Sequence, residues 1–195
     1  MIADNSVDLV ISNCVLNLVA DHQKQQLVEE IFRVLKPGGR VAISDIVSDR
    51  AIPADMKNDP ELWSGCISGA FHEAGFLEAF TARGFMAAQY DKWDAQPWQT
   101  VNDIEVRSAT LTAFKPEQTD ANGGGCHVIY RGPFAAVTDV TGNTYQRGQR
   151  TAVSTATAAM LANPAYSGAF INTTETGDTA AGCCTPENNS GNSCC

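Results

Sequence analysis

The sequence predicts an α/β fold, and three neighbouring segments carry this prediction. Residues 6–13 form a short apolar run, typical of a parallel strand covered on both faces. Residues 21–35 place apolar side chains at helical spacing, and the Pro-Gly-Gly at 37–39 ends that helix. A second apolar strand follows at 40–47. Strand, helix and strand of these lengths form one right-handed crossover of a parallel sheet.

Later segments extend this pattern. Helices are expected at 54–69 and 73–83, and a strand from Gly84 toward Trp93. Residues 103–115 alternate apolar and polar side chains, and this pattern fits either a strand or a helix. A glycine-rich break at 120–125 precedes the last predicted elements, which are a strand at 126–131, a hairpin at 134–146 and a short helix at 154–161.

The chain is therefore expected to have three parts. Residues 1–97 form the sheet domain, and residues 98–172 form a small α+β domain. Residues 173–195 contain almost no apolar side chains and are expected to be a flexible, disordered Cys-rich tail, unless a ligand gathers its cysteines.

Composition excludes several classes of function. Acidic residues outnumber basic ones 22 to 13, and the resulting net charge of −9 argues against a nucleic-acid partner. No window holds the roughly 18 apolar residues that a membrane helix needs, so no membrane partner is expected. The first residues lack the basic start and apolar stretch of a signal peptide. A soluble, cytoplasmic protein is predicted.

Seven cysteines make thiol chemistry the first functional class to consider. Three are isolated, namely Cys14, Cys66 and Cys126, and four form the adjacent pairs Cys183-Cys184 and Cys194-Cys195. An odd number of cysteines without an export signal favours reduced thiols over a disulfide framework. The adjacent pairs lack the two-residue gap of typical zinc ligands.

Four motifs in the first 70 residues form a more specific pattern. They are Asp8-Leu-Val-Ile-Ser-Asn-Cys-Val-Leu-Asn-Leu18, Lys36-Pro-Gly-Gly39, Ser44-Asp45 and Cys66-Ile-Ser-Gly-Ala70. Together they resemble the arsenite S-adenosylmethionine methyltransferases, which are class I methyltransferases, although Pro-Gly-Gly alone also fits an ordinary turn. Val128-Ile-Tyr-Arg-Gly132 resembles a strand of that family's C-terminal domain. The resemblance covers roughly residues 3–170 and implies a truncated Rossmann-like class I methyltransferase sheet.

The resemblance also implies a site. Cys14 and Cys66 match cysteines that bind trivalent arsenic in the family, and thiolates are the soft ligands that suit this ion. S-adenosylmethionine is the family's methyl donor, and Ser12 and Asn13 match contacts to its methionine part. Small thiols such as glutathione, or a thioredoxin-type reductant, are the implied partners. The implied reaction is methyl transfer to thiol-bound arsenic, which detoxifies it.

The chain also departs from the family pattern. A class I methyltransferase holds its cofactor with a glycine-rich loop after its first strand and an acidic residue after the second. This sequence has neither, and it lacks a third upstream cysteine of the family. We therefore expect a C-terminal fragment that is inactive by itself.

Other interpretations stay open at this stage. Cys14 also fits a small buried core residue. The tail cysteines Cys183, Cys184, Cys194 and Cys195 suit either arsenic chelation or no function. The chain could thus be a non-catalytic thiol protein that sequesters arsenic or soft metal ions, or a class I methyltransferase for another small acceptor. Asp45 is expected to be a loop or helix-dipole residue rather than a catalytic acid.

Overall fold

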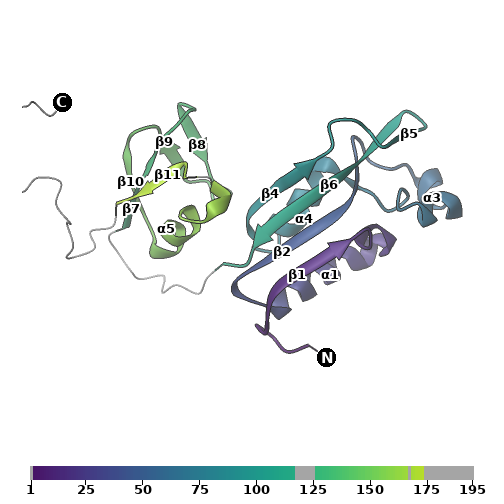
Figure 1. Cartoon of the computed structure of the whole chain (residues 1–195), viewed down its shortest axis with the longest axis horizontal. Helices are drawn as coiled ribbons and strands as arrows, with labels where there is room; N and C mark the ends of the chain where they lie inside the picture. The colour runs from purple at the N-terminus through teal and green to yellow at the C-terminus, as the bar shows by residue number, and fades with distance from the viewer. Residues whose placement is uncertain (1, 117–125, 167, 174–195) are drawn as a thin grey trace, which may run out of the picture.

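The computed structural model describes residues 2–116, 126–166 and 168–173, and its elements form two parts (Figure 1). The larger part is a six-stranded mixed sheet whose main path runs β1-β2-β6-β4. The smaller part contains a three-stranded sheet, a two-stranded hairpin and a short helix. The predicted break at 120–125 lies outside the described residues, as does the tail from residue 174. Within the described part of the chain, no helix has both the length and the apolar character needed to span a bilayer.

The structure confirms the predicted crossover. Its three elements are β1 (Val7–Asn13), α1 (Asp21–Val34) and β2 (Leu35–Ser48). β1 and β2 pair in parallel, with Asn13 opposite Ser44. β2 begins earlier than expected, so the Pro-Gly-Gly lies within the strand instead of preceding it. A Cβ atom on Gly39 would lie 2.8 Å from the Lys36 carbonyl oxygen, and this crowding explains why a glycine stands there.

The exposure of β1 differs from the expectation of a strand covered on both faces. Ile11 is 71% exposed, because β2 is the only partner of β1 among the described strands and β1 therefore forms an edge of the sheet. Strand β2 is interior to the sheet, and its side chains at Val41, Ile43 and Val47 are fully buried. Strand position therefore decides burial here more than the apolar character of the residues does.

Helix α1 and helix α4 (Glu73–Thr81) cover the larger sheet and touch each other (Figure 1). Phe76 and Phe80 of α4 are fully buried in the core that these helices form with β2 and β6. The single helix predicted at 54–69 is instead two short helices, α2 (Ala54–Lys57) and α3 (Pro60–Ser64). The break occurs because Pro60 lacks an amide hydrogen, while the Asp59 side chain caps a new helix start by accepting from two backbone N–H groups.

The ambiguous segment 103–115 is a strand, β6 (Ile104–Phe114). It lies between β2 and β4 (Met86–Trp93) and pairs antiparallel with both, so its alternate residues are buried. Two short strands, β3 (Phe71–His72) and β5 (Gln99–Val101), pair with β2 and β6. Residues 99–114, which were expected in the smaller domain, thus pair within the larger sheet.

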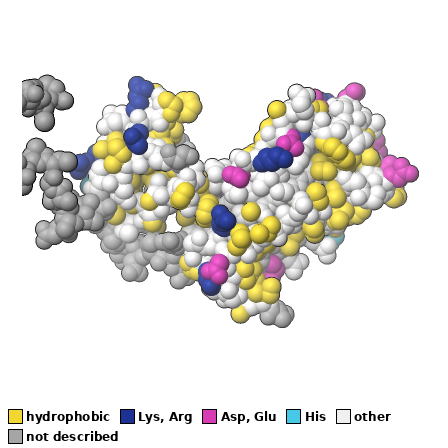
Figure 2. Space-filling view, viewed as in Figure 1, with side chains coloured by type: hydrophobic (Ala, Val, Ile, Leu, Met, Phe, Trp, Pro, Cys, Tyr) yellow, Lys and Arg dark blue, Asp and Glu magenta, His cyan; other side chains and the backbone are white. Residues whose placement is uncertain are grey.

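The smaller part contains the predicted strand, hairpin and helix. These elements are β7 (Cys126–Tyr130), β8 (Ala136–Thr138), β9 (Thr144–Gln146) and α5 (Thr155–Leu161), and two further strands, β10 (Arg150–Val153) and β11 (Phe170–Asn172), flank β7. Met86 of β4 packs against the apolar cluster of this part, so the two parts touch. A notch separates their upper portions in the space-filling view (Figure 2).

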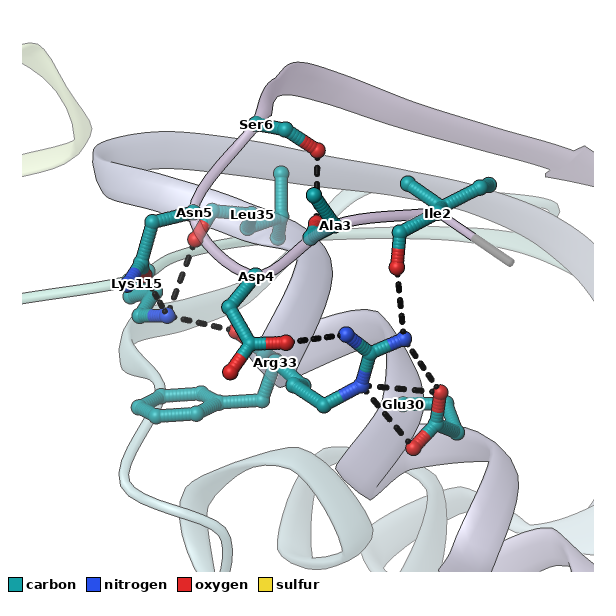
Figure 3. A network of polar contacts seen from close by, with 10 residues as sticks. Ile2, Ala3, Asp4, Asn5, Ser6, Glu30, Arg33, Leu35 and Lys115 are labelled. Carbon is teal, nitrogen blue, oxygen red and sulfur yellow. Dashed lines mark hydrogen bonds and ion pairs between the residues drawn. The ribbon is translucent and has the colours of Figure 1, made fainter.

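Polar contacts fix the first residues of the chain to α1 and to the end of β6 (Figure 3). Arg33 forms ion pairs with Asp4 and Glu30 and donates to the Ile2 carbonyl oxygen. The Lys115 ammonium group donates to the Asn5 side chain at 2.7 Å, and to two backbone carbonyl oxygens at the end of α1. These contacts hold the segment before β1 in place.

Candidate thiol site

The structure brings Cys14 and Cys66 together. The Cys66 thiol donates to the Cys14 carbonyl oxygen with an Sγ···O distance of 3.7 Å. Cys14 directly follows β1, and Cys66 follows α3, which lies beside the carboxyl end of β1 (Figure 1). Both are free thiols, with Cys14 exposed and Cys66 partly buried. The carboxyl ends of parallel strands are where sheets of this kind bind ligands.

Both cysteines adopt backbone conformations that are uncommon for residues other than glycine. The φ angle is +53° at Cys14 and +62° at Cys66. Such a conformation costs roughly 1–3 kcal/mol for an ordinary residue, so the surrounding structure must hold it in place. The surrounding hydrogen bonds hold it, since the Cys14 N–H donates to the Ser44 carbonyl oxygen at 2.9 Å and the Cys66 N–H donates to Trp63 at 3.0 Å.

Asp45 lies beside the two thiols, and it belongs to β2 instead of the loop that was expected. Its side chain is 2% exposed and accepts from the backbone N–H groups of Asn17 and Ile46 at 3.3 and 2.8 Å. Asn17 belongs to the 3-10 turn that follows Cys14. Asp45 therefore positions the loop that carries Cys14. Burial raises the pKa of the Asp45 carboxyl, although its backbone hydrogen bonds act in the opposite direction.

Burial and the charge of Asp45 act together on the thiols. Burial is the larger cause of a raised pKa at Cys14 and at Cys66, and the Asp45 carboxylate is the second cause at each. The thiols are therefore protonated at neutral pH, and a ligand that binds sulfur must displace a proton from each of them.

A close backbone contact holds the segment after Cys66 against the turn after Cys14. A Cβ atom on Gly69 would lie only 1.9 Å from the Asn17 carbonyl oxygen, so no larger residue fits there. The Asn17 side chain is fully buried and donates to the Ile46 carbonyl oxygen at 2.7 Å. Lys24 of α1 donates to the Gly69 carbonyl oxygen at 2.6 Å. These contacts fix the separation of the two cysteine-bearing loops.

Sequence reasoning did not single out Asn17, Lys24 or Gly69. Asn17 and Gly69 stand inside the motifs that carry Cys14 and Cys66, which was the one available signal. The contacts described above join residues 28 or more positions apart, and no local spacing shows such contacts.

The other predicted site residues lie in different places. Ser12 is partly buried and Asn13 is exposed at the end of β1, next to Cys14. Cys126 is buried in β7 of the smaller part, with Thr155 Oγ1 at 3.9 Å from its sulfur. Cys183, Cys184, Cys194 and Cys195 lie outside the described residues. Among the residues that the structure describes, no group of three or more His, Cys, Asp or Glu side chains could hold a metal ion.

Comparison with known proteins relates this chain to a family of enzymes. The chain is 32% identical to an arsenite methyltransferase from Mus musculus over 181 residues, which are 87% of this chain and 47% of that protein. It is 38% identical to an arsenite methyltransferase from Halobacterium salinarum over 126 residues, covering 61% of this chain and 32% of the other. The chain thus spans at most about half the length of these relatives.

A solved structure and one of the two matching family models agree with this result. An arsenic(III) S-adenosylmethionine methyltransferase from Chlamydomonas reinhardtii superposes with a TM-score of 0.50 at 28% identity, covering 88% of this chain and 60% of that one. Residues 117–190 match a domain of unknown function (DUF8838). Residues 1–103 match the model of a methyltransferase domain and contain both loops of the thiol site. With its crossover, its strand order and this match over more than half of its length, the chain belongs to the methyltransferase domain family, with a partial Rossmann-like sheet.

Proposed function

We propose that this chain is the arsenic-binding part of an arsenite methyltransferase, in which Cys14 and Cys66 bind trivalent arsenic. The observation that carries the proposal is the contact between the Cys66 sulfur and the Cys14 backbone, at the carboxyl end of β1. Two thiols held by separate loops at one sheet edge suit a small, soft, thiophilic ion. The names of the similar proteins support the same substrate.

The binding step follows from the protonated thiols. Each thiol exchanges with one hydroxyl group of arsenous acid, so that one S–As bond forms and one As–O bond breaks. The thiol proton leaves with that hydroxyl group as water, and two exchanges release two waters without any change in oxidation state. The leaving hydroxyl group takes up each thiol proton. The loops therefore need only hold the two sulfurs within reach of one arsenic atom.

S-adenosylmethionine is the methyl donor in this proposal, and its sulfonium group would supply an electrophilic methyl group. This chain contributes Ser12 and Asn13 at the end of β1 to that site. The described residues beside β1 include no glycine-rich loop and no acidic partner for a ribose, so the residues present do not make up a cofactor site. We therefore expect this chain by itself to bind arsenite without methylating it.

The proposed reaction needs a reducing compartment and a reductant for the two thiols. Free thiols at Cys14 and Cys66 require a reducing environment, which favours the cytoplasm. A small thiol such as glutathione, or a thioredoxin-type reductant, would keep these sulfurs reduced between binding events.

Arsenic content per chain after gel filtration in arsenite tests the proposal. We expect about one arsenic per chain from the Cys14–Cys66 pair, and loss of that arsenic in Cys14→Ser and in Cys66→Ser. Cys126→Ser is the matched control, since Cys126 lies in the other part of the molecule, and it should retain arsenic.

The tail cysteines separate this proposal from the sequestration alternative. A variant with serine at positions 183, 184, 194 and 195 should still bind arsenic through Cys14 and Cys66. If this variant loses all arsenic while Cys14→Ser retains it, the chain is a thiol protein that binds through its tail. If no variant changes the arsenic content, Cys14 and Cys66 are packing residues, as expected of a methyltransferase for another acceptor.

A further inference from the structure

The smaller part of the molecule contains a cavity that lies apart from the thiol site. It has a volume of about 320 Å³ and lies between β7, the β8–β9 hairpin and β11. Hydrophobic side chains show at the surface over this hairpin (Figure 2). Five aromatic residues contribute to its wall, namely Tyr130, Phe134, Tyr145, Tyr166 and Phe170.

The aromatic rings form a connected wall around Phe170. Its ring centroid lies 5.4 Å from that of Tyr130, 5.2 Å from that of Tyr145 and 6.1 Å from that of Tyr166. Phe134 is 67% exposed, so its ring stands at the open side of the cavity. Aromatic faces carry negative charge density and attract cations within about 6 Å.

One carboxylate, Asp139, also lies in the wall of this cavity. The Tyr145 hydroxyl donates to its Oδ2 atom at 2.6 Å, and the Asn143 side chain donates to the same oxygen at 3.0 Å. The backbone and hydroxyl of Thr141 and the backbone of Asn143 donate to Oδ1 at 2.8–2.9 Å. These side-chain and backbone hydrogen bonds outweigh its burial and lower the pKa of Asp139 to about 2. The carboxylate therefore stays charged at neutral pH.

The charge of Asp139 has no ion-pair partner within the described residues. Arg131 and Arg147 donate to the carbonyl oxygens of Gly168 and Pro133, at 3.3 and 3.0 Å, and neither forms an ion pair with Asp139. An aromatic cavity thus adjoins one negative charge that is hydrogen-bonded but has no ion-pair partner among the described residues. The negative charge and the aromatic rings favour binding of a cation in this cavity.

The hydrogen bonds on Asp139 also define what kind of cation fits. Five donors already occupy its two oxygens, so a primary amine would find few free lone pairs to accept its N–H groups. A quaternary ammonium ion has no N–H groups and interacts through charge and through its methyl groups alone. Aromatic cages recognise such ions by the same physical means.

We propose that this cavity binds a small quaternary ammonium cation, held by the rings of Phe134, Tyr166 and Phe170, which are partly or largely exposed, and by the charge of Asp139. This site is separate from Cys14 and Cys66, and its occupation does not depend on arsenic binding. Tyr166 ends a 3-10 turn (Pro164–Tyr166) that contacts β4. An occupied cavity would therefore lie next to the contact between the two parts of the molecule.

Titration of the full 195-residue chain with choline, followed by NMR of the backbone amides, tests this proposal. We expect saturable shifts confined to residues around the cavity. The neutral isostere 3,3-dimethylbutan-1-ol should bind at least tenfold more weakly, and ethanolamine should also bind more weakly. Equal binding of choline and the neutral isostere would show an ordinary apolar pocket and overturn the proposal, as would the absence of choline binding.

Two pairs of variants separate the contributions of the rings and the charge. Phe134→Leu keeps an apolar side chain but removes a ring, and we expect choline binding to weaken roughly two- to fivefold. Trp98→Leu removes an exposed ring outside the cavity and should leave binding unchanged. Asp139→Asn should abolish binding, whereas Tyr145→Phe, which removes one hydrogen bond but keeps the charge, should retain it. Unchanged affinity in both Phe134→Leu and Asp139→Asn would refute the site.

Discussion

The sulfur of Cys66 lies 3.7 Å from the carbonyl oxygen of Cys14, although 52 residues separate them in the chain. The two loops meet because β1 ends at the same sheet edge to which α3 and the following segment return. Two contacts with the Asn17 backbone fix both loops: buried Asp45 accepts from its N–H group, and Gly69 packs against its carbonyl oxygen. The thiol pair is therefore a product of the fold of the larger part, and its chemistry depends on residues that do not contact a ligand.

The charge of Asp45 should control how readily the two thiols react. Its carboxylate raises the pKa of Cys14 and Cys66, in addition to the larger effect of burial. A raised pKa means fewer thiolates at a given pH, so alkylation by iodoacetamide should keep accelerating above the pH at which an ordinary thiol reaches its plateau. In Asp45→Asn the charge is removed, the pKa of both thiols falls, and alkylation at pH 8 becomes faster. Mass spectrometry of the alkylated peptides measures each rate separately.

Asp49→Asn is a suitable control for this experiment. Asp49 follows the end of β2 and pairs with Arg50 at 3.0 Å, and its charge is not among the causes of the shifts at either thiol. Its substitution should leave both rates unchanged. Equal acceleration in both variants would mean that Asp45 acts through the net charge of the protein, not through its position.

Much of the larger sheet could be predicted from the sequence, because β1, α1 and β2 have strong local patterns. The pattern at 103–115 could not decide between strand and helix, since only pairing with β2 and β4 makes alternate residues of β6 buried. The break between α2 and α3 has a local signal in Asp59-Pro60, which the apolar spacing around Trp63 outweighed. Cys14 and Cys66 were named from a motif, whereas the support from Asn17 and Lys24 depends on long-range contacts that no spacing reveals.

Gly69 should be indispensable, because a side chain there has no space. In Gly69→Ala the new methyl group would meet the Asn17 carbonyl oxygen at 1.9 Å, so one of the two loops must move. We expect a loss of about 1–3 kcal/mol in the free energy of unfolding. Arsenite binding should also weaken, since the loops that carry Cys14 and Cys66 would separate. Urea unfolding and arsenic content per chain measure the two effects.

Gly75→Ala provides the matched control for Gly69→Ala. Gly75 lies inside α4, and the nearest atom to a Cβ there is 3.9 Å away, which is an ordinary contact. Because alanine is the better helix former, this variant should gain about 0.5–1 kcal/mol in the free energy of unfolding and keep its arsenic. A stability loss of similar size in both variants would contradict the packing argument.

Lys115 should contribute more to stability than an exposed lysine, because its ammonium group satisfies acceptors at the end of α1. It donates to the carbonyl oxygens of Phe32 and Leu35 at 2.7 and 2.8 Å and lies 4.7 Å from the centre of the Phe32 ring (Figure 3). Lys115→Met leaves these carbonyl groups without that donor, and we expect a cost of about 1–3 kcal/mol in the free energy of unfolding.

In Lys92→Met, by contrast, an exposed ion pair with Asp94 is lost, and the change in the free energy of unfolding should stay within about 0.5 kcal/mol. Tryptophan fluorescence in urea measures both variants, because all three tryptophans lie in the larger part. If the two lysine variants lose equal stability, the contacts of Lys115 do not hold the beginning of the chain to α1.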